Sequence, residues 1–140
     1  MIYYLAGKMS GIPQFNFPAF IKAAAILRSR GHNIISPAEL DSKEVREQAL
    51  ESTDGILHNG KIAGETWGDI LSRDVKIVAD DVQGIVFLPG WEYSRGARLE
   101  AFVGLLCKHS FNMYDPDHHV GMRRLRSEYI RDMLYDIDPR

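Results

Sequence analysis

Short apolar runs bounded by turn residues divide this chain at regular intervals. They occur at residues 2–6, 32–37, 85–88 and 110–114. Apolar runs of this kind are typical of parallel strands that are buried on both faces. The pattern therefore predicts a parallel sheet of four to five strands.

Amphipathic segments separate these runs. Apolar residues recur at steps of three and four within the ranges 20–27, 67–78, 94–108 and 120–135, and this spacing predicts helices. Asn16, Thr66 and Ser94 precede three of them and are favoured helix-capping residues. Alternating strands and helices predict an α/β class, with a Rossmann-like three-layer fold whose sheet is flanked by helices.

Two further segments have a less regular pattern. Residues 38–53 are polar and charged, and the pairs Asp54-Gly55 and Asn59-Gly60 mark turns. We expect residues 54–65 to form a mobile excursion that serves as a lid or an interface loop. We expect residues 1–114 to form one domain and residues 115–140 a C-terminal helical extension that packs on this domain or on a partner subunit.

Composition excludes several classes of protein. A net charge of −2 provides no broad basic face, so we expect no nucleic acid as a partner. No apolar run approaches the ~20 residues that span a bilayer, and the first residues lack the basic leader of a signal peptide. The single cysteine, Cys107, has no partner for an internal disulfide. We therefore expect a cytoplasmic protein without a membrane partner, in the host cytoplasm if a phage encodes it.

The stretch from Val86 to Val103 contains the most informative chemistry. A buried strand ends at Pro89-Gly90, and a helix begins at Ser94. This order places the free N–H groups of the helix at the carboxyl end of the strand, where open α/β sheets bind ligands and where anions are attracted. Glu100 lies six residues beyond Ser94, past the first turn, so capping does not explain its carboxylate.

The loop after the first strand is a second candidate for ligand binding. It contains Gly7, Lys8, Ser10 and Gly11. Glycines allow the backbone to approach a ligand closely, and Lys8 and Ser10 are suited to a phosphate or sugar oxygen. An equally good interpretation is a tight strand-to-helix turn with a solvated Lys8.

Carboxylates are the candidate catalytic groups that remain once metal binding and a cysteine nucleophile are considered. The adjacent His118 and His119 do not form a metal cluster, and Cys107 lies among leucines rather than in a nucleophile motif. Glu100 and Asp74 lie on the helices after and before the 85–88 strand, and paired carboxylates are the recurring means of breaking glycosidic bonds. The alternative for Asp74 is a surface ion pair with its neighbours.

The chain has a Tyr-hydrophobic-Ala-Gly motif at residues 4–7 and a Leu-Pro-Gly-Trp…Ser-Arg-Gly-Ala…Glu block at residues 88–100. These motifs resemble those of the nucleoside 2-deoxyribosyltransferase superfamily. The resemblance is greatest to a phage and bacterial, DUF4406-like branch of small uncharacterised domains. It rests on these two motifs, and it covers residues 2–114. The superfamily contains transferases that exchange bases on deoxyribose and N-glycosidases that hydrolyse the same bond in nucleoside 5′-monophosphates.

The resemblance implies roles for particular residues. Glu100 corresponds to the glutamate that attacks the anomeric carbon or stabilises the cation there. Asp74 corresponds to the aspartate that orients a sugar hydroxyl or donates a proton, with Asp80 and Asp81 as weaker substitutes. Tyr4 corresponds to the tyrosine that holds the glutamate, and Tyr3 is its alternative because neighbours on a strand face opposite sides.

A phosphate-binding site is also implied by the resemblance. Ser94 and Gly96 correspond to the serine and glycine that hold the phosphate, with Lys8 and Ser10 standing where the hydrolases place serine and arginine. The whole predicted phosphate site comprises Gly7, Lys8, Met9, Ser10, Gly11, Ser94 and Gly96.

Three functions follow as hypotheses. The first is hydrolysis of the N-glycosidic bond of a (deoxy)nucleoside 5′-monophosphate, the second is base exchange on free deoxynucleosides, and the third is non-catalytic nucleotide binding. The resemblance implies no cofactor, no metal, a small-molecule nucleotide or nucleoside as the binding partner, and a homodimer or larger homo-oligomer. Four aromatic residues are candidates for a wall against the base or for the core: Phe15, Phe17, Trp67 and Trp91.

Overall fold

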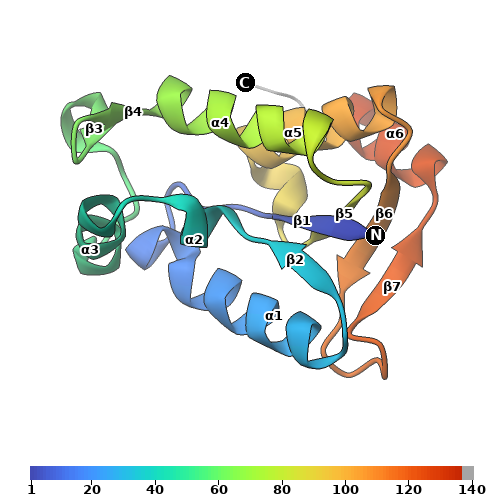
Figure 1. Ribbon diagram of the computed structural model, residues 1–140. Helices are drawn as coiled ribbons and strands as arrows, with labels where there is room; N and C mark the ends of the chain where they lie inside the picture. Colours follow the sequence, from blue (N-terminus) through green and yellow to red (C-terminus); the bar gives the residue numbers. More distant parts are fainter. Residues whose placement is uncertain (137–140) are drawn as a thin grey trace.

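The computed structural model describes residues 1–136, so the last four residues of the predicted 115–140 extension lie outside the described part. A five-stranded sheet forms the centre, in the order β2-β1-β5-β6-β7 (Figure 1). Its strands are β1 (Ile2–Ala6), β2 (Asn33–Ile35), β5 (Gly84–Phe87), β6 (Ser110–Tyr114) and β7 (Met122–Leu125). The first four are parallel, and β7 is antiparallel to β6.

Helices cover both faces of this sheet. Helix α1 (Phe17–Ser29) lies on one face, and α4 (Trp67–Asp80), α5 (Arg95–Leu106) and α6 (Ser127–Asp136) lie on the other (Figure 1). Alternating side chains of β1 fill the two cores: Leu5 packs with α1, whereas Tyr4 and Ala6 pack with α4 and α5. The three layers and the C-terminal helix confirm the predicted α/β class.

The segments between β2 and α4 lie together beyond the carboxyl end of β1 (Figure 1). They comprise helices α2 (Pro37–Leu40) and α3 (Lys43–Glu51) and the hairpin of β3 (Lys61–Ile62) and β4 (Glu65–Thr66). Single 3-10 turns occur at η1 (Pro13–Asn16), η2 (His58–Gly60) and η3 (Trp91–Tyr93). The predicted excursion at residues 54–65 thus contains a small hairpin, whose Ile62 is buried.

The helix expected over residues 120–135 is wrong in its first part. Met122–Leu125 form β7, and only Ser127–Asp136 are helical. Met122 and Leu125 are three residues apart, which fits a helix, but the open edge of β6 offers a complete ladder of backbone hydrogen bonds instead. Exposed Arg123 and Arg124 place charge on the new edge strand, a common protection against further strand pairing.

The predicted cap at Asn16 is also wrong. Asn16 has a left-handed backbone (φ 60°), and its side chain does not cap α1. Its amide donates instead to the carbonyl of Lys8 at 2.9 Å. By contrast, the hydroxyls of Thr66 and Ser94 accept backbone N–H groups of α4 and α5, as favoured cap residues do.

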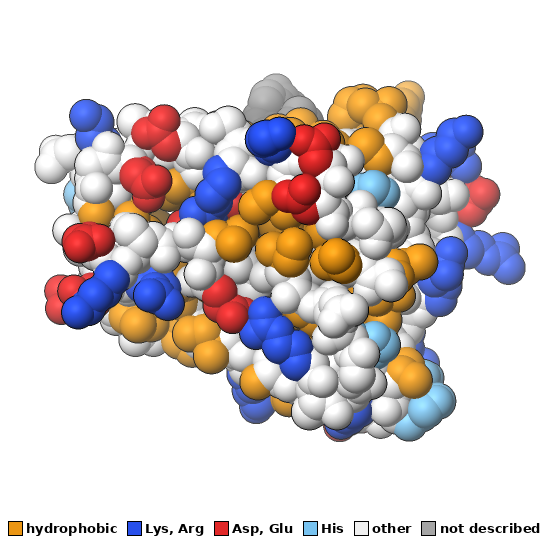
Figure 2. All heavy atoms as spheres, in the orientation of Figure 1, with side chains coloured by type: hydrophobic (Ala, Val, Ile, Leu, Met, Phe, Trp, Pro, Cys, Tyr) orange, Lys and Arg blue, Asp and Glu red, His pale blue; other side chains and the backbone are white. Residues whose placement is uncertain are grey.

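The surface carries charges of both signs. Acidic and basic side chains are interspersed over the face shown in Figure 2, with basic groups gathered on the side where β7 lies. None of the helices within residues 1–136 is long and apolar enough to cross a membrane.

The strand order creates a crevice between β1 and β5. From β1 the chain crosses to β2 on one side, and it later returns to β5 on the other side. The connections after these neighbouring strands therefore diverge to opposite faces of the sheet. The gap at their carboxyl ends is the position where open α/β sheets bind ligands.

Candidate active site

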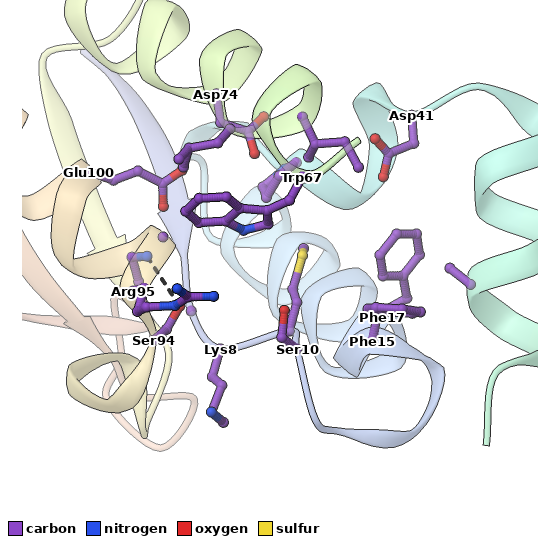
Figure 3. Close-up of a pocket in the computed structure, with 18 of the residues that line it drawn as sticks. Lys8, Ser10, Phe15, Phe17, Asp41, Trp67, Asp74, Ser94, Arg95 and Glu100 are labelled. Carbon is purple, nitrogen blue, oxygen red and sulfur yellow. Dashed lines mark hydrogen bonds between the residues drawn. The ribbon is translucent and has the colours of Figure 1, made fainter. Parts of the chain in front are cut away.

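A cleft of about 180 Å³ occupies this crevice. Its walls come from the loop after β1, from α2 and α3, from α4, and from the start of α5 (Figure 3). The cleft therefore collects residues that lie far apart in the chain.

A buried hydrogen bond joins Tyr4 to Glu100 on one wall of the cleft. The Tyr4 hydroxyl donates to Oε2 of Glu100 at 2.6 Å. Side chains alternate along β1, so Tyr4 faces α4 and α5, whereas Tyr3 faces away and packs edge-on against His32. Of the two tyrosines considered from the sequence, Tyr4 is the one that reaches the glutamate.

Burial raises the pKa values of both Tyr4 and Glu100. Glu100 is 5% exposed, and its burial, reinforced by the charge of Asp74, raises the pKa of its carboxyl to about 8. The Tyr4 hydrogen bond and the Arg73 charge oppose this rise only in part. The pKa of Tyr4 is raised too, first by burial and then by Glu100, so its hydroxyl remains a donor.

Asp74 is the second buried carboxylate of the cleft, at 7% exposed. Arg73 donates to its Oδ1 from Nε at 3.0 Å and from Nη2 at 2.8 Å. Burial raises the pKa of Asp74, against lowering by Arg73 and by the Tyr4 hydroxyl. The ion pair with Arg73 is thus present, but it is not at the surface, and Lys76 pairs with Asp80 instead.

Arg73 also binds a third carboxylate, which the sequence did not indicate. Its Nη1 donates to Oδ1 of Asp41 at 2.6 Å, and Asp41 is 8% exposed and lines the cleft. The two aspartates are 33 positions apart, so no local pattern connects them. The one available signal was physical: a buried Asp74 needs a cation, and Arg73 is its neighbour.

The opposite end of the cleft is cationic. The hydroxyl of Ser94 accepts the N–H of Ala97 at 3.1 Å and caps α5, and Gly96 lies in the same first turn. Lys8 donates to the carbonyl of Tyr93 at 3.3 Å. The guanidinium of Arg95 lies 5.0 Å from the ring centroid of Trp67 (Figure 3). Arg95 had no assigned role from the sequence, although it stands inside the Ser-Arg-Gly-Ala block.

Only part of the loop at residues 7–11 lines the cleft. Gly7, Lys8, Met9 and Ser10 line the cleft. Gly11 does not, because its N–H donates to the carbonyl of Gly55 at 2.8 Å. Its predicted contact with a ligand is therefore not supported by its position.

Of the four aromatic residues proposed for the base wall, three line the cleft and one lies in the core. Trp67 is 40% exposed and lines the cleft, and Phe15 and Phe17 line it with little exposure. Trp91 is fully buried and stacks on Phe87 with ring centroids 4.2 Å apart. The interpretation of Trp91 as a base wall is wrong, because its ring packs in the core between the sheet and α5 and does not line the cleft.

No group of three or more His, Cys, Asp or Glu within residues 1–136 is arranged to hold a metal ion. The cleft can supply buried carboxylates, a tyrosine hydroxyl and a cationic helix end. This set suits proton transfer and nucleophilic attack beside a bound anion.

Comparison with known proteins gives one match. The model of a domain of unknown function (DUF4406) matches residues 1–60. No curated protein and no solved structure matches the chain. The matched part includes Tyr4, the glycine loop and Asp41, and it ends before Asp74, Ser94 and Glu100.

Proposed function

We propose that this protein hydrolyses the N-glycosidic bond of a nucleoside 5′-monophosphate, giving free base and sugar 5-phosphate. The observation that carries the proposal is the two-ended cleft. Buried Glu100 and Asp74 lie at one side, and the capped start of α5 lies six residues from Glu100 with Lys8 and Arg95 beside it. Such an arrangement suits a sugar whose reacting carbon and phosphate are at opposite ends.

Glu100 and Asp74 have different roles in the step that breaks the glycosidic bond. Ionised Glu100 attacks C1′, and the bond between C1′ and the base nitrogen breaks with its electron pair leaving on the base. Asp74 supplies the proton that the departing base takes up. Water then attacks C1′ and gives its proton to the Asp74 carboxylate, while the ester bond breaks to release sugar 5-phosphate and ionised Glu100.

The proton that buried Glu100 retains serves this step. Two carboxylates close to one buried hydroxyl do not both ionise readily, so the pair retains a proton near neutral pH. Transfer of that proton from Glu100 to Asp74 produces a nucleophile and an acid together. The Tyr4 hydroxyl stabilises the ionised glutamate while this happens.

The phosphate is held by the cationic end. The Ser94 hydroxyl and the N–H groups of the first turn of α5 that Ser94 does not cap are the donors for this anion. Lys8 and Arg95 line the same end of the cleft and add positive charge. This end would contribute nothing to a free nucleoside, and it therefore favours the monophosphate over the transferase substrate.

Incubation with a pool of nucleoside 5′-monophosphates tests the function. We expect chromatography to show free base and sugar phosphate, and Glu100→Ala to abolish both. Addition of a foreign base with a free deoxynucleoside provides the contrast, because formation of a new nucleoside would indicate base exchange. Tight nucleotide binding with no base released even at high enzyme concentration would instead indicate a binding module.

Two substitutions at Ser94 test the phosphate site. Ser94→Ala should lower kcat/KM for monophosphates about 10- to 100-fold, since a hydrogen bond to a charged group is lost, and should leave free nucleosides unaffected. Ser94→Asp retains a helix cap, so it should preserve the melting temperature while repelling the phosphate. Equal losses for both substrate classes would contradict the phosphate role.

A further inference from the structure

Asp41 lies at the end of the cleft that is remote from the anion site. It follows the last residue of α2 and is 8% exposed, yet it lines the cleft. Figure 3 shows its carboxylate directed into the cleft, across from Phe17 and away from Ser94 and Arg95. A charge this deeply placed requires a compensating group.

Among the described residues, one oxygen of Asp41 has a hydrogen-bond partner. Oδ1 accepts from Nη1 of Arg73 at 2.6 Å. Within residues 1–136, no donor makes a hydrogen bond to Oδ2. Oδ2 is not among the fully buried polar atoms that lack a partner. It therefore keeps access to the cleft that Asp41 lines, where a ligand N–H group can donate to it.

The position of Asp41 relative to Asp74 identifies the part of the ligand that it meets. A single guanidinium, that of Arg73, separates the two carboxylates. If Asp74 protonates the leaving base, then the base extends from Asp74 along the cleft toward Asp41. Phe17 lies across from Asp41 in this part of the cleft, and Trp67 lines the cleft between Asp41 and Arg95. Both rings suit the faces of a flat base.

We propose that Oδ2 of Asp41 accepts a hydrogen bond from an exocyclic amino group of the base, so that the substrate is a nucleoside 5′-monophosphate with an amino-bearing base. This inference rests on the proposed function for the direction in which the nucleotide lies. An ionised carboxylate accepts hydrogen bonds and donates none. A keto oxygen at the same place would put two acceptors together and would leave Asp41 unpaired.

Two pairs of nucleotides isolate this contact. The bases of dCMP and dUMP differ in the amino or keto group at one ring position and in the proton that the keto base carries on the adjacent ring nitrogen, as do those of dAMP and dIMP. We expect kcat/KM of the wild-type protein to favour the amino member of at least one pair about 100-fold or more, because sites built to bind a polar group strongly reject analogues that lack it.

Asp41→Asn is the decisive variant. Its carbonyl oxygen can still accept from Arg73, while its amide nitrogen replaces Oδ2 and donates where the carboxylate accepted. We expect the preference to fall at least tenfold and to move toward the keto member. Asp41→Ala removes both contacts and should lower activity toward both members without moving the preference to keto bases.

Two results would overturn the inference. One is a wild-type protein that does not discriminate within either pair or that prefers the keto members. The other is an equal loss for both members in Asp41→Asn, which would show that Asp41 acts only by positioning Arg73.

Calorimetric binding of the same four nucleotides separates this inference from the proposed reaction. Amino-selective binding that Asp41→Asn reverses, with no base released, would contradict the hydrolysis and support the role of Asp41. Base release without amino selectivity would support the hydrolysis and contradict the role of Asp41. No binding and no release with any of the four would contradict both.

Discussion

The proton that Glu100 retains at neutral pH predicts how activity depends on pH. Because burial raises the pKa of Glu100 to about 8, the pair loses its last proton above that pH. We expect kcat/KM to be highest near neutral pH and to fall about tenfold per pH unit above about 8. Rate measurements from pH 5 to 10 check this. A rise through pH 8 to a plateau would show instead that Asp74 stays ionised and only orients the sugar.

Tyr4→Phe tests how the Tyr4 hydroxyl affects the protonation of Glu100. The Tyr4 hydroxyl favours the ionised form of Glu100, so its removal should raise the pKa of Glu100 further. We expect kcat to fall about tenfold or more and the basic limb of the pH profile to move to higher pH. A lower kcat with an unmoved limb would mean that Tyr4 contributes packing alone.

Glu100 also links folding stability to pH. Its pKa is about 8 in the folded protein and 4.5 ordinarily. As the pH rises from 4.5 to 8, the unfolded chain releases a proton that the folded protein keeps, so stability falls across this window. Glu100→Gln removes the penalty, and it should gain about 2–4 kcal/mol over the wild type between pH 5 and pH 8.

Urea unfolding at both pH values measures this gain. Glu51→Gln, on the exposed surface of α3, provides the control and should change stability equally at pH 5 and pH 8. If Glu100→Gln showed the same lack of pH dependence, the glutamate would not retain its proton in the folded protein.

At the scale of elements, the loop before α1 and the loop after α3 are in close backbone contact beside the cleft. Residues 14–16 have three consecutive left-handed backbones, and backbone hydrogen bonds attach this segment and Gly11 to residues 52 and 55. A Cβ on Gly55 would lie 2.0 Å from the carbonyl oxygen of Ile12. Only glycine therefore fits where the two loops meet.

Gly55→Ala should accordingly destabilise the fold by about 3 kcal/mol or more and weaken nucleotide binding. Gly60→Ala is the matched control, because Gly60 has a similar φ of +72° with no atom within 4 Å of an added Cβ. It should cost about 1 kcal/mol from backbone strain alone. Thermal melts of both variants measure the difference, and equal losses would show that the contact with Ile12 is unimportant.

The helix starts show what local sequence can specify. Ser94 and the pair Thr66 and Asp69 cap their helices as their residue types indicate, because a cap needs only atoms within three or four residues. Residues 122–125 were misinterpreted as helix for the converse reason. Their strand exists because β6 has an open edge, and that edge is distant in the sequence.

At the scale of the whole molecule, the C-terminal segment belongs to the core. Ile130 of α6 is fully buried beside α5 and the sheet, whereas its neighbour Tyr129 is 41% exposed. Ile130→Ala should cost about 2–5 kcal/mol of folding stability, and Tyr129→Ala about 1 kcal/mol or less. Equal, small losses in urea unfolding would mean that α6 is an appendage.

Self-association remains a prediction of the resemblance. We expect a homodimer or larger assembly, and light scattering over a range of protein concentrations measures its mass. A monomer mass at every concentration would contradict it. The same experiment on Phe102→Ser, which alters a half-exposed side chain of α5, shows whether this helix takes part.

The sequence by itself determined the α/β class, the positions of β1, β5 and β6, and the caps of α4 and α5, because periodicity and capping are local. It also singled out Tyr4, Asp74 and Glu100 through their resemblance to a family. Their contact was decided only by the tertiary structure, since the alternation along β1 and the strand order bring them together from three elements. Asp41 and its clamp on Arg73 were decided in the same way, because burial turns an ordinary surface charge into one that must find a partner.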